Sequence, residues 1–555
     1  MTAEATAKRI QWLYAFIGMA VLLNFSGLWI TVIGPDGALY ASIAKNMVVN
    51  NNYTDLFVEG RDWLDKPHFP FWMAALSFKI FGISGWAYKL PGVLFVMMGA
   101  FYTYKFAKAL YNKEIALWSV LILLSAQHLI ISNMDVRAEP YLTGLIIASV
   151  YYFYKAMAAR WFWPLVLASL FAALAVMTKG IFALIPVAGA IAGHLIISRQ
   201  WSLLFNWRWL WAAVLVLLFM SPELYSLYQQ FDAHPEKVVF GQTHVSGLKF
   251  FFWDSQFGRF FNSGPIKKAN GDPSFFLHTT LWAFLPWSLL LYAAVVQMIR
   301  KGYRNAKSSP WFNGCGAGFT FLIFSLSKFQ LPHYITIIFP FFAIITAQYL
   351  YSVRSVATVK LIRITQTSVA LLMVIAIALL HYFFQPDQLS AAFYIALFAS
   401  IVVLFLTTLY VRADQFKVLF QSVAVALIVN VYFNFAYYPQ LTTYQADSEA
   451  AFFLNEHNPK HLPVVKMVNG YSYAIDLYSK QNLYYYRIGE QNVLPEKPYL
   501  IYGDQGFIDQ LEAEGIKGVV VKTFGRYPIT RLKGQFLNKQ TRAESLHTSQ
   551  VILIK

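Results

Sequence analysis

Blocks of about 20 apolar residues recur along most of this chain, and this repetition restricts the fold more than any other feature. Twenty residues in an α-helix span the ~30 Å hydrocarbon core of a bilayer. Only 13% of the 555 residues are charged, against roughly 25% in a soluble globular protein. The single cysteine, Cys315, excludes an intramolecular disulfide. The chain is therefore predicted to be an all-α polytopic membrane protein.

The apolar blocks predict about thirteen transmembrane helices. Their expected ranges are 10–30, 91–110, 115–132, 139–157, 161–178, 181–198, 208–228, 278–299, 311–327, 332–351, 364–382, 389–411 and 415–436. No A-x-A-like cleavage site follows the first block, so we expect it to be an uncleaved first helix. An odd number of spans places the two ends of the chain on opposite sides of the membrane.

The net charge of +17 would suggest nucleic acid as a partner if the protein were soluble. With the N-terminus inside the cell, however, the basic residues concentrate in the inner segments, where Lys8, Arg9 and Arg300 are examples. The segments on the other side carry acids and bases in nearly equal numbers. This is the positive-inside pattern of membrane proteins. It predicts a cytoplasmic N-terminus, and no nucleic acid is needed to explain the charge.

Three segments on the outer side are unusually long, at 31–90, 229–277 and 437–555. The last has ordinary polarity and predicts a small α/β domain, which leaves a transmembrane domain over 1–436. Its expected strands are 462–468, 483–488, 499–502, 518–522 and 551–554, and its expected helices are 448–456 and 505–514. In the first outer segment, residues 38–49 and 69–81 have the periodicity of helices that lie along the membrane surface.

Ionisable residues gather in five short motifs at the outer ends of spans. The motifs are Gly34-Pro35-Asp36-Gly37, Asp65-Lys66-Pro67-His68, Asp135-Val136-Arg137-Ala138-Glu139, Thr178-Lys179-Gly180 and Ser327-Lys328-Phe329-Gln330-Leu331-Pro332-His333-Tyr334. Singly, each is more often an interfacial anchor or a helix cap, and Asp36 has the position of an N-cap. Five on one face indicate function, because charges near hydrocarbon are costly.

The residue types in these motifs suit an anionic ligand. Lys66, Lys179 and Lys328 are isolated cations that would hold a phosphate by charge. Asp36 and Asp135 are acids suited to take a proton or to help hold a metal ion. No P-loop, no GxGxxG after a strand and no paired-cysteine motif occurs. The motifs therefore predict an enzyme that uses a lipid-linked phosphate at an outward-facing site.

The order of the motifs resembles that of the bacterial ArnT-like and protein O-mannosyltransferase family of GT-C glycosyltransferases. The residues that carry the resemblance are Asp36-x3-Tyr40-Ala41, Asp65-Lys66-Pro67, Asp135, Thr178-Lys179-Gly180, Pro286-Trp287 and Ser327-Lys328-x2-Leu331-Pro332-x-Tyr334. The resemblance extends over nearly the whole chain. It implies a GT-C fold in the cell inner membrane, with the C-terminal domain in the periplasm.

The activity implied by the resemblance is transfer of an aminoarabinose- or mannose-like sugar from a polyprenyl-phosphate donor to a periplasmic acceptor. The implied acceptor is lipid A, another envelope glycolipid or a protein, so protein O-mannosyltransferase remains the alternative within the family. An alternative of another class is a polyprenyl-lipid transporter or flippase. A transporter would show inverted repeats and charges near the bilayer midplane, whereas here the charges lie at span ends and we find no repeat.

The resemblance also implies roles for single residues. Asp36 and Asp135 match the acids of the first two outer loops and are the expected catalytic residues. Lys66 matches the lysine that holds the donor phosphate, and Arg259 resembles a loop arginine in contact with that phosphate. Lys179 and Lys328 are the further expected phosphate ligands. The expected neighbours of the substrate are Asp65, Tyr40, His333 and Tyr334.

A divalent metal ion (Mg, Mn or Zn) would be held in the neighbourhood of Asp36, Asp65 and Gln256. Two departures from the family pattern affect this site. Gly37 follows Asp36 where the family often has Glu, and Gln256 stands where the arabinose transferases often have His. Both changes remove metal ligands, which leaves a metal-dependent and a metal-free site open and weakens the case for lipid A as the acceptor.

Overall fold

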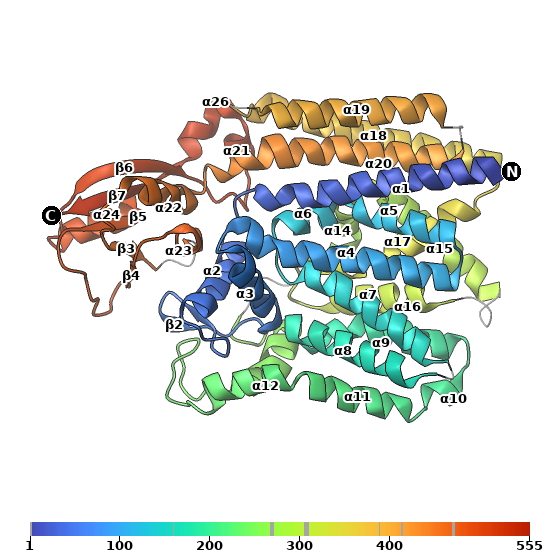
Figure 1. Cartoon of the computed structure of the whole chain (residues 1–555), viewed down its shortest axis with the longest axis horizontal. Coiled ribbons are helices and arrows are strands. Elements are labelled where there is room, and N and C mark those ends of the chain that lie inside the picture. The colour runs from blue at the N-terminus through green and yellow to red at the C-terminus, as the bar shows by residue number, and fades with distance from the viewer. Residues whose placement is uncertain are drawn as a thin grey trace.

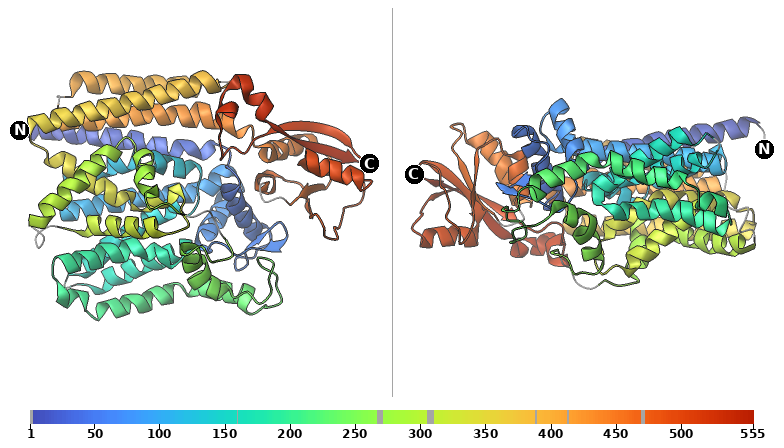
Figure 2. Two further views of the ribbon diagram at one scale, coloured as in Figure 1. Left: turned by 180° about the vertical axis from the view of Figure 1, so that it is seen from behind. Right: turned by 90° about the horizontal axis from the view of Figure 1, so that it is seen from below.

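The computed structural model describes residues 3–158, 160–266, 271–304, 310–387, 389–411, 414–468 and 472–555. Within these ranges, long helices lie side by side in a bundle, and a sheet with its own helices projects from one end of it (Figure 1). The N-terminus lies at the opposite end of the bundle, and two further views show the same arrangement (Figure 2).

Long helices make up most of the bundle. They are α1 (Ala3–Ser26), α4 (Gly85–Leu110), α5 (Lys113–Leu124), α6 (Gln127–Met134), α7 (Glu139–Ala156), α8 (Phe162–Lys179), α9 (Ile185–Ile197), α11 (Arg208–Phe219), α15 (Ser288–Arg304), α16 (Phe312–Leu326), α17 (Phe339–Ser352), α18 (Val356–Phe384), α19 (Ala391–Tyr410) and α20 (Gln415–Tyr432). Eight helical stretches of the described residues are long and apolar enough to cross a membrane, and α5 with α6, bent by 55°, would make a ninth. A mostly helical polytopic membrane protein is thus confirmed, and the count of thirteen spans stays a prediction.

Each predicted span coincides with one helix or with consecutive helical segments. The spans built from several segments also use η1 (Gly27–Trp29), η2 (Ile181–Leu184), α12 (Ser221–Leu227), α14 (Phe275–Ala283), η5 (Pro332–Ile338) and η6 (Phe433–Tyr437). Helices at the rim of the bundle expose large apolar side chains, such as Leu218 of α11, Leu372 of α18 and Phe398 of α19. α7 and α20, in contrast, are buried along most of their length. An apolar rim suits lipid, whose tails are as apolar as leucine.

The segment between α1 and α4 forms a layer between the bundle and the sheet (Figure 1). It contains α2 (Asp36–Val49), the hairpin of β1 (Phe57–Val58) and β2 (Arg61–Asp62), and α3 (Phe69–Phe81). The two helices predicted at 38–49 and 69–81 are confirmed. Pro70 stands in the first turn of α3, where its missing N–H costs no hydrogen bond and its fixed φ favours helix initiation.

Residues 438–555, called the sheet region below, contain a five-stranded sheet with strand order β4-β3-β5-β7-β6. The strands are β3 (Val464–Met467), β4 (Leu483–Tyr486), β5 (Tyr499–Asp504), β6 (Val519–Arg526) and β7 (His547–Ile554), and the main helices are α22 (Ala446–His457), α23 (Tyr473–Tyr478) and α24 (Gln505–Ala513). β3, β4 and β5 are parallel, and β7 pairs antiparallel with β5 and β6. Each predicted strand and helix of this region overlaps an observed one, but α23 was not predicted.

Alternation along the central strands explains why helices cover both faces of this sheet. Val465 and Ile501 pack in one apolar cluster with Phe507 of α24. Their neighbours Val464 and Leu500 pack in a second cluster on the other face, with α22 and α23. Successive side chains of a strand point to opposite faces, so two adjacent apolar residues require cover on both sides.

Candidate active site

The two predicted catalytic acids are joined by an arginine. Arg137 Nη1 donates to Asp36 Oδ2 at 2.6 Å, and Arg137 Nη2 lies 2.9 Å from Asp135 Oδ2. Asp36 is the first residue of α2, and the N-cap position is taken by Pro35. The interpretation of Asp36 as a helix cap is therefore wrong: its carboxylate, 43% exposed, is oriented by Arg137. No role was predicted for Arg137.

Gly37 explains how α2 can approach these acids so closely. A Cβ atom at this position would lie 3.3 Å from Asp135 Oδ1 and 3.4 Å from a methyl group of Val32. The glycine found where the family often has Glu thus lets the start of α2 pack directly on Asp135. Asp135 Oδ1 is buried, with no hydrogen-bond partner among the described residues.

A second charged cluster is formed by two segments. One is the loop before α3, and the other is η4 (Phe250–Gly258) together with Arg259, the residue that follows it. Asp65 Oδ2 accepts a hydrogen bond from Lys66 Nζ at 2.6 Å, and Asp65 Oδ1 pairs with Arg259. The guanidinium of Arg259 lies over the ring of Phe329, 5.6 Å from its centroid. All three charged side chains are mostly buried, so the cluster has two cations for one acid and favours an additional anion.

A third cluster surrounds Glu139, the first residue of α7. Its nearly buried carboxylate accepts a hydrogen bond from Lys179 and lies 3.8 Å from His333 Nε2. Lys179 Nζ also lies 3.7 Å from the centroid of the Tyr334 ring. Glu139 was not among the predicted site residues, although it ends one of the five charged motifs. Because Glu139 already compensates Lys179, this lysine is less available to a phosphate than Lys66.

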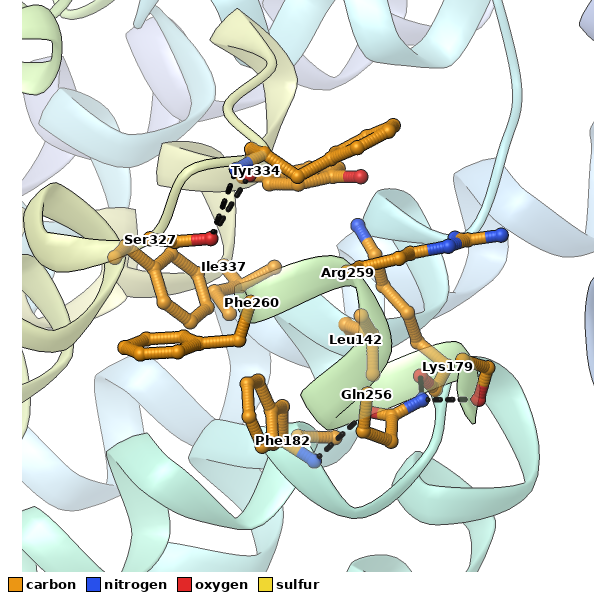
Figure 3. Close-up of a pocket in the computed structure, with 13 residues that line it drawn as sticks. Leu142, Lys179, Phe182, Gln256, Arg259, Phe260, Ser327, Tyr334 and Ile337 are labelled. Carbon is orange, nitrogen blue, oxygen red and sulfur yellow. Dashed lines mark hydrogen bonds between the residues drawn. The ribbon is translucent and has the colours of Figure 1, made fainter. Parts of the chain in front are cut away.

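Two adjoining cavities meet at these cations. The larger is lined mainly by aromatic and apolar side chains, and Figure 3 shows it with Lys179 and Arg259. The smaller has Asp65, Lys66 and Glu223 in its wall. The residues that line both cavities are Lys179, Ser255, Gln256 and Arg259. Cations thus stand where an apolar chamber meets a polar one, as a phosphate on an apolar chain would require.

Gly180 allows the contact between the end of α8 and η4. Its φ of +91° lies in the region that favours glycine, and a Cβ atom there would collide with the amide of Gln256. Gln256 Nε2 donates to Lys179 O at 3.2 Å, and Phe182 N donates to Gln256 Oε1 at 3.3 Å (Figure 3). The glycine of the Thr178-Lys179-Gly180 motif therefore fixes the backbone of Lys179 against η4.

The pKa of Lys66 depends on burial and on groups of the neighbouring clusters. Burial lowers the pKa of Lys66 from its usual value, while Tyr334, Asp36 and Glu139 raise it. Tyr40, which was predicted to lie near the substrate, is buried beside Asp36, and burial together with that carboxylate raises the pKa of its hydroxyl. Tyr40, Tyr334 and the charged residues are therefore close enough to affect one another's pKa, and we treat them as one site.

Lys328 is the one predicted phosphate ligand that the structure does not bring to these cavities. Its side chain is exposed, and it lines neither cavity, although its neighbours Ser327 and Phe329 line the larger one. Its backbone N–H donates to Phe260 O at 3.0 Å. Lys328 therefore ties the end of α16 to the arginine-bearing segment through its main chain.

A buried pair supports the Lys66 loop from behind. His68 donates its backbone N–H to Glu223 Oε2 at 2.9 Å, and its Nδ1 lies 3.0 Å from Glu223 Oε1. His68 Nε2 faces the carbonyl of Thr54 at 2.9 Å. Both ring nitrogens therefore face oxygen atoms, and the contacts of His68 with Glu223 and Thr54 fix the loop that carries Lys66. A lone acid at a span end was the only sequence signal for Glu223.

The residues named for a metal ion are already engaged. Asp36 is paired with Arg137, Asp65 is paired with two cations, and Gln256 binds backbone groups of neighbouring segments. Among the residues that the structure describes, no three His, Cys, Asp or Glu side chains converge on one point. This donor set does not fit a divalent cation, which prefers several free oxygen or nitrogen ligands, and we derive no step through a metal.

We therefore expect that metal removal leaves activity nearly unchanged. Protein treated with EDTA and then desalted should keep its activity within about 2-fold of untreated protein, because cations of the chain would bear the charge of a bound phosphate. The measurement is the activity in metal-free buffer with and without added Mg, Mn or Zn. A rate that falls more than 10-fold and returns with one of these ions would contradict the expectation.

Three comparisons show which known proteins this chain is similar to. Residues 65–225 match the family described as dolichyl-phosphate-mannose-protein mannosyltransferase. An uncharacterised protein of Aquifex aeolicus (strain VF5) is 28% identical over 395 residues, which are 67% of this chain and 72% of that one. Undecaprenyl phosphate-alpha-4-amino-4-deoxy-L-arabinose arabinosyl transferase 2 of Proteus mirabilis (strain HI4320) is 28% identical over 318 residues, 56% of this chain. The match spans 53% of that relative's length.

The fold is shared with a solved structure. The crystal structure of ArnT from Cupriavidus metallidurans bound to undecaprenyl phosphate superposes with a TM-score of 0.75, over 98% of each chain and at 17% sequence identity. At that identity the likeness shows the fold. Together the three comparisons confirm the resemblance to the ArnT-like and protein O-mannosyltransferase family of GT-C glycosyltransferases.

Proposed function

We propose that this ArnT-like chain is an integral-membrane glycosyltransferase that moves an aminoarabinose- or mannose-like sugar from a polyprenyl-phosphate donor to a periplasmic acceptor. The observation that carries the proposal is the position of Arg259 at the junction of the aromatic and the polar cavity, with Lys66 in the wall of the polar cavity and joined to Arg259 through Asp65. A polyprenyl phosphate needs both environments at once. The names of the arabinosyl transferases that match more than half of this chain support the same donor.

In the proposed reaction the acceptor oxygen attacks the anomeric carbon of the donor. The bond from that carbon to the phosphate oxygen breaks, and its electron pair leaves with the polyprenyl phosphate. Lys66 and Arg259 stabilise the charge that develops on this phosphate. Asp36 takes the proton of the acceptor, and Arg137 holds its carboxylate in place. Asp135 shares Arg137 and completes the ion cluster.

The roles of the other predicted residues follow from their contacts. We assign Lys179 a supporting role, because Glu139 compensates its charge and His333 lies beside that acid. Tyr334 covers Lys179 and lines the aromatic cavity, where the first isoprene units would lie. Asp65 sets the distance between the two phosphate-binding cations, since it contacts both of them.

The acceptor is proposed to be lipid A or another envelope glycolipid, and a protein acceptor is the second candidate. The lipid acceptor rests on the resemblance to the ArnT-like transferases, since the names of the arabinosyl relatives give only the sugar and its undecaprenyl-phosphate carrier. The family that matches residues 65–225 is named for a protein acceptor. Mass spectra of lipid A and of envelope proteins, from cells with and without this gene, decide between them. A sugar mass lost from neither fraction, together with movement of intact donor across the membrane, would instead favour a polyprenyl-lipid flippase.

The topology belongs to the same proposal. Thirteen spans would place residues 1–436 in the inner membrane, with the N-terminus in the cytoplasm and residues 437–555 as a domain in the periplasm. Fluorescence of a reporter that is active only in the cytoplasm should be absent when it is fused after Lys555 and strong when it is fused before Lys8. Strong fluorescence from the fusion after Lys555 would place that end of the chain, and the proposed active site with it, on the cytoplasmic side.

A further inference from the structure

The sheet region contacts the backbone that carries Asp36. Val32 N donates to Tyr478 Oη at 2.9 Å, and Gly34 N donates to Gln445 Oε1 at 2.8 Å. Gln445 Nε2 donates in return to Val32 O at 3.0 Å. These contacts bind the chain two and four residues before Asp36 to residues more than 400 positions away in the sequence, and they are unrelated to the pairing of the Asp36 carboxylate with Arg137.

The body of α2 is fixed to the same region. Ser42 Oγ donates to Tyr473 O at 2.9 Å. Lys45 Nζ donates to three carbonyl groups at the end of α23, those of Asp476 at 2.6 Å, Leu477 at 3.2 Å and Ser479 at 2.8 Å. The free carbonyl groups at a helix C-terminus attract a cation, so this lysine caps α23. α2 therefore has its first residue in the site and its later turns held by α23, as their adjacent positions in Figure 1 suggest.

A buried ion cluster fastens the hairpin that follows α2. Lys466 of β3 is fully buried and pairs with Asp476 of α23 and with Glu59, whose Oε1 lies 2.7 Å from its Nζ. Burial lowers the pKa of Lys466, but Asp476 and Glu59 outweigh this effect, so its pKa is raised and it stays charged. Breaking one partner of such a buried pair is costly. The sheet region is thus held rigidly against the segment on both sides of α2.

From these contacts we infer that Gln445 and Tyr478 are positioning residues for Asp36, through which the sheet region sets the place of the proposed proton acceptor. The inference rests on the proposed function for the role of Asp36. Its physical basis is that a displacement of about 1 Å at a reacting group can reduce a rate on the order of 10²-fold. Gln445 fixes one donor and one acceptor of a segment that has no regular secondary structure at residues 31–33 and leads directly into α2.

The test replaces the two positioning side chains in the full-length protein. We expect Gln445→Ala to lower kcat at least 10-fold, with KM for a defined polyprenyl-phosphate sugar changed less than 2-fold, because donor contacts lie elsewhere. Tyr478→Phe, which removes one hydroxyl, should lower kcat about 3- to 10-fold. The matched control is Arg61→Met, which breaks another contact between the same two parts of the molecule, the exposed pair with Glu490. It should transfer sugar at the native rate.

A double-mutant cycle separates positioning from a merely structural effect. If Gln445 acts through Asp36, Gln445→Ala should change transfer less than about 2-fold in the Asp36→Asn background, because the group it positions is already lost. Equal losses in both backgrounds would overturn the inference. A native rate of Gln445→Ala, even with a lower melting temperature, would also overturn it and leave Gln445 as a structural contact.

Hydrogen exchange keeps this test distinct from that of the proposed function. The amides of Val32 and Gly34 should exchange slowly in the native protein. Exchange should be faster at Gly34 in Gln445→Ala and faster at Val32 in Tyr478→Phe, because each variant removes the acceptor of that amide and permits local opening. Unchanged exchange in both variants would overturn the inference without reference to activity. Absence of sugar transfer by the native protein from any polyprenyl-phosphate donor would instead refute the proposed function.

Discussion

Lys66→Met is expected to lower kcat for sugar transfer by roughly 10²–10³-fold, the scale for losing one preorganised group that stabilises developing charge. The leaving polyprenyl phosphate gains about one negative charge as the glycosidic bond breaks, so a cation beside it stabilises the transition state more than the ground state. Lys66 and Arg259 share Asp65, and only the lysine is removed. Asp65 keeps its arginine partner, so the variant should fold normally.

The matched control for this prediction is Lys79→Met. Lys79 lies on α3, near the same loop, but it is exposed and its Nζ stands over the Tyr53 ring, 4.7 Å from its centroid. Such an exposed cation–π contact is worth only about 0.5–1 kcal/mol, and transfer should change less than about 2-fold. Both variants are assayed with one defined donor. Equal activity of the two would mean that Lys66 only pairs with Asp65 and does not serve the phosphate.

The charged motifs were sufficient to locate the site because charged residues are scarce in this chain. Lys66 and Lys179 are far apart in the sequence, yet both line the smaller cavity. Asp36 and Asp135 line neither cavity, but Arg137 joins them to each other, and Asp36 raises the pKa of Lys66. Each of these motif residues ends or precedes an apolar span, and span ends on one side of a bundle meet at one surface. The sequence could therefore predict which residues gather, but not how they pair, since pairing depends on side-chain directions that only packing determines.

Arg137 and Lys328 illustrate why the pairing of side chains could not be predicted from the sequence. Arg137 bridges the two predicted catalytic acids, Asp36 and Asp135. Nothing in the sequence around Arg137 distinguishes such a bridge from a solvent-exposed charge. Lys328 has the same type of position as Lys179, a lysine after an apolar helix, but the chain leaves α16 with the extended backbone of Ser327 and the Lys328 side chain is exposed. A single residue at a helix end thus decides whether a cation enters the site.

The contacts of the sheet region were beyond prediction for another reason. Each of the five strands contains a short run of apolar or aromatic residues and could be recognised, whereas α23 has six residues and no helix-capping hydrogen bond from a side chain. Gln445 and Tyr478 are uncharged and belong to no motif, so their contact with the Asp36 segment depends entirely on tertiary docking. Pro286-Trp287, part of the family pattern, proves structural here, since the buried Trp287 donates to Ser125 Oγ at 3.0 Å.

Asp36→Asn is expected to lower transfer about 10²-fold or more, the usual scale for removing a general base. The change keeps the size of the side chain, and the amide oxygen can still accept from Arg137. Arg137 also keeps Asp135 as a partner, at 2.9 Å, so no buried cation is left uncompensated and the fold should persist. What is lost is the negative charge that would take the acceptor proton. KM for the donor should change little, because Lys66 and Arg259 are untouched.

The matched control is Asp414→Asn, at the end of the bundle far from the sheet. Asp414 also pairs with an arginine, Arg9, at 2.9 Å, and it caps α20 by accepting from Phe416 N. Asparagine caps a helix about as well as aspartate, so this variant loses one carboxylate charge beside an arginine without approaching the site. It should transfer sugar at the native rate. A native rate for Asp36→Asn as well would mean that Asp36 only orients Arg137. The proton acceptor would then be sought at Asp135, whose buried Oδ1 has no hydrogen-bond partner among the described residues.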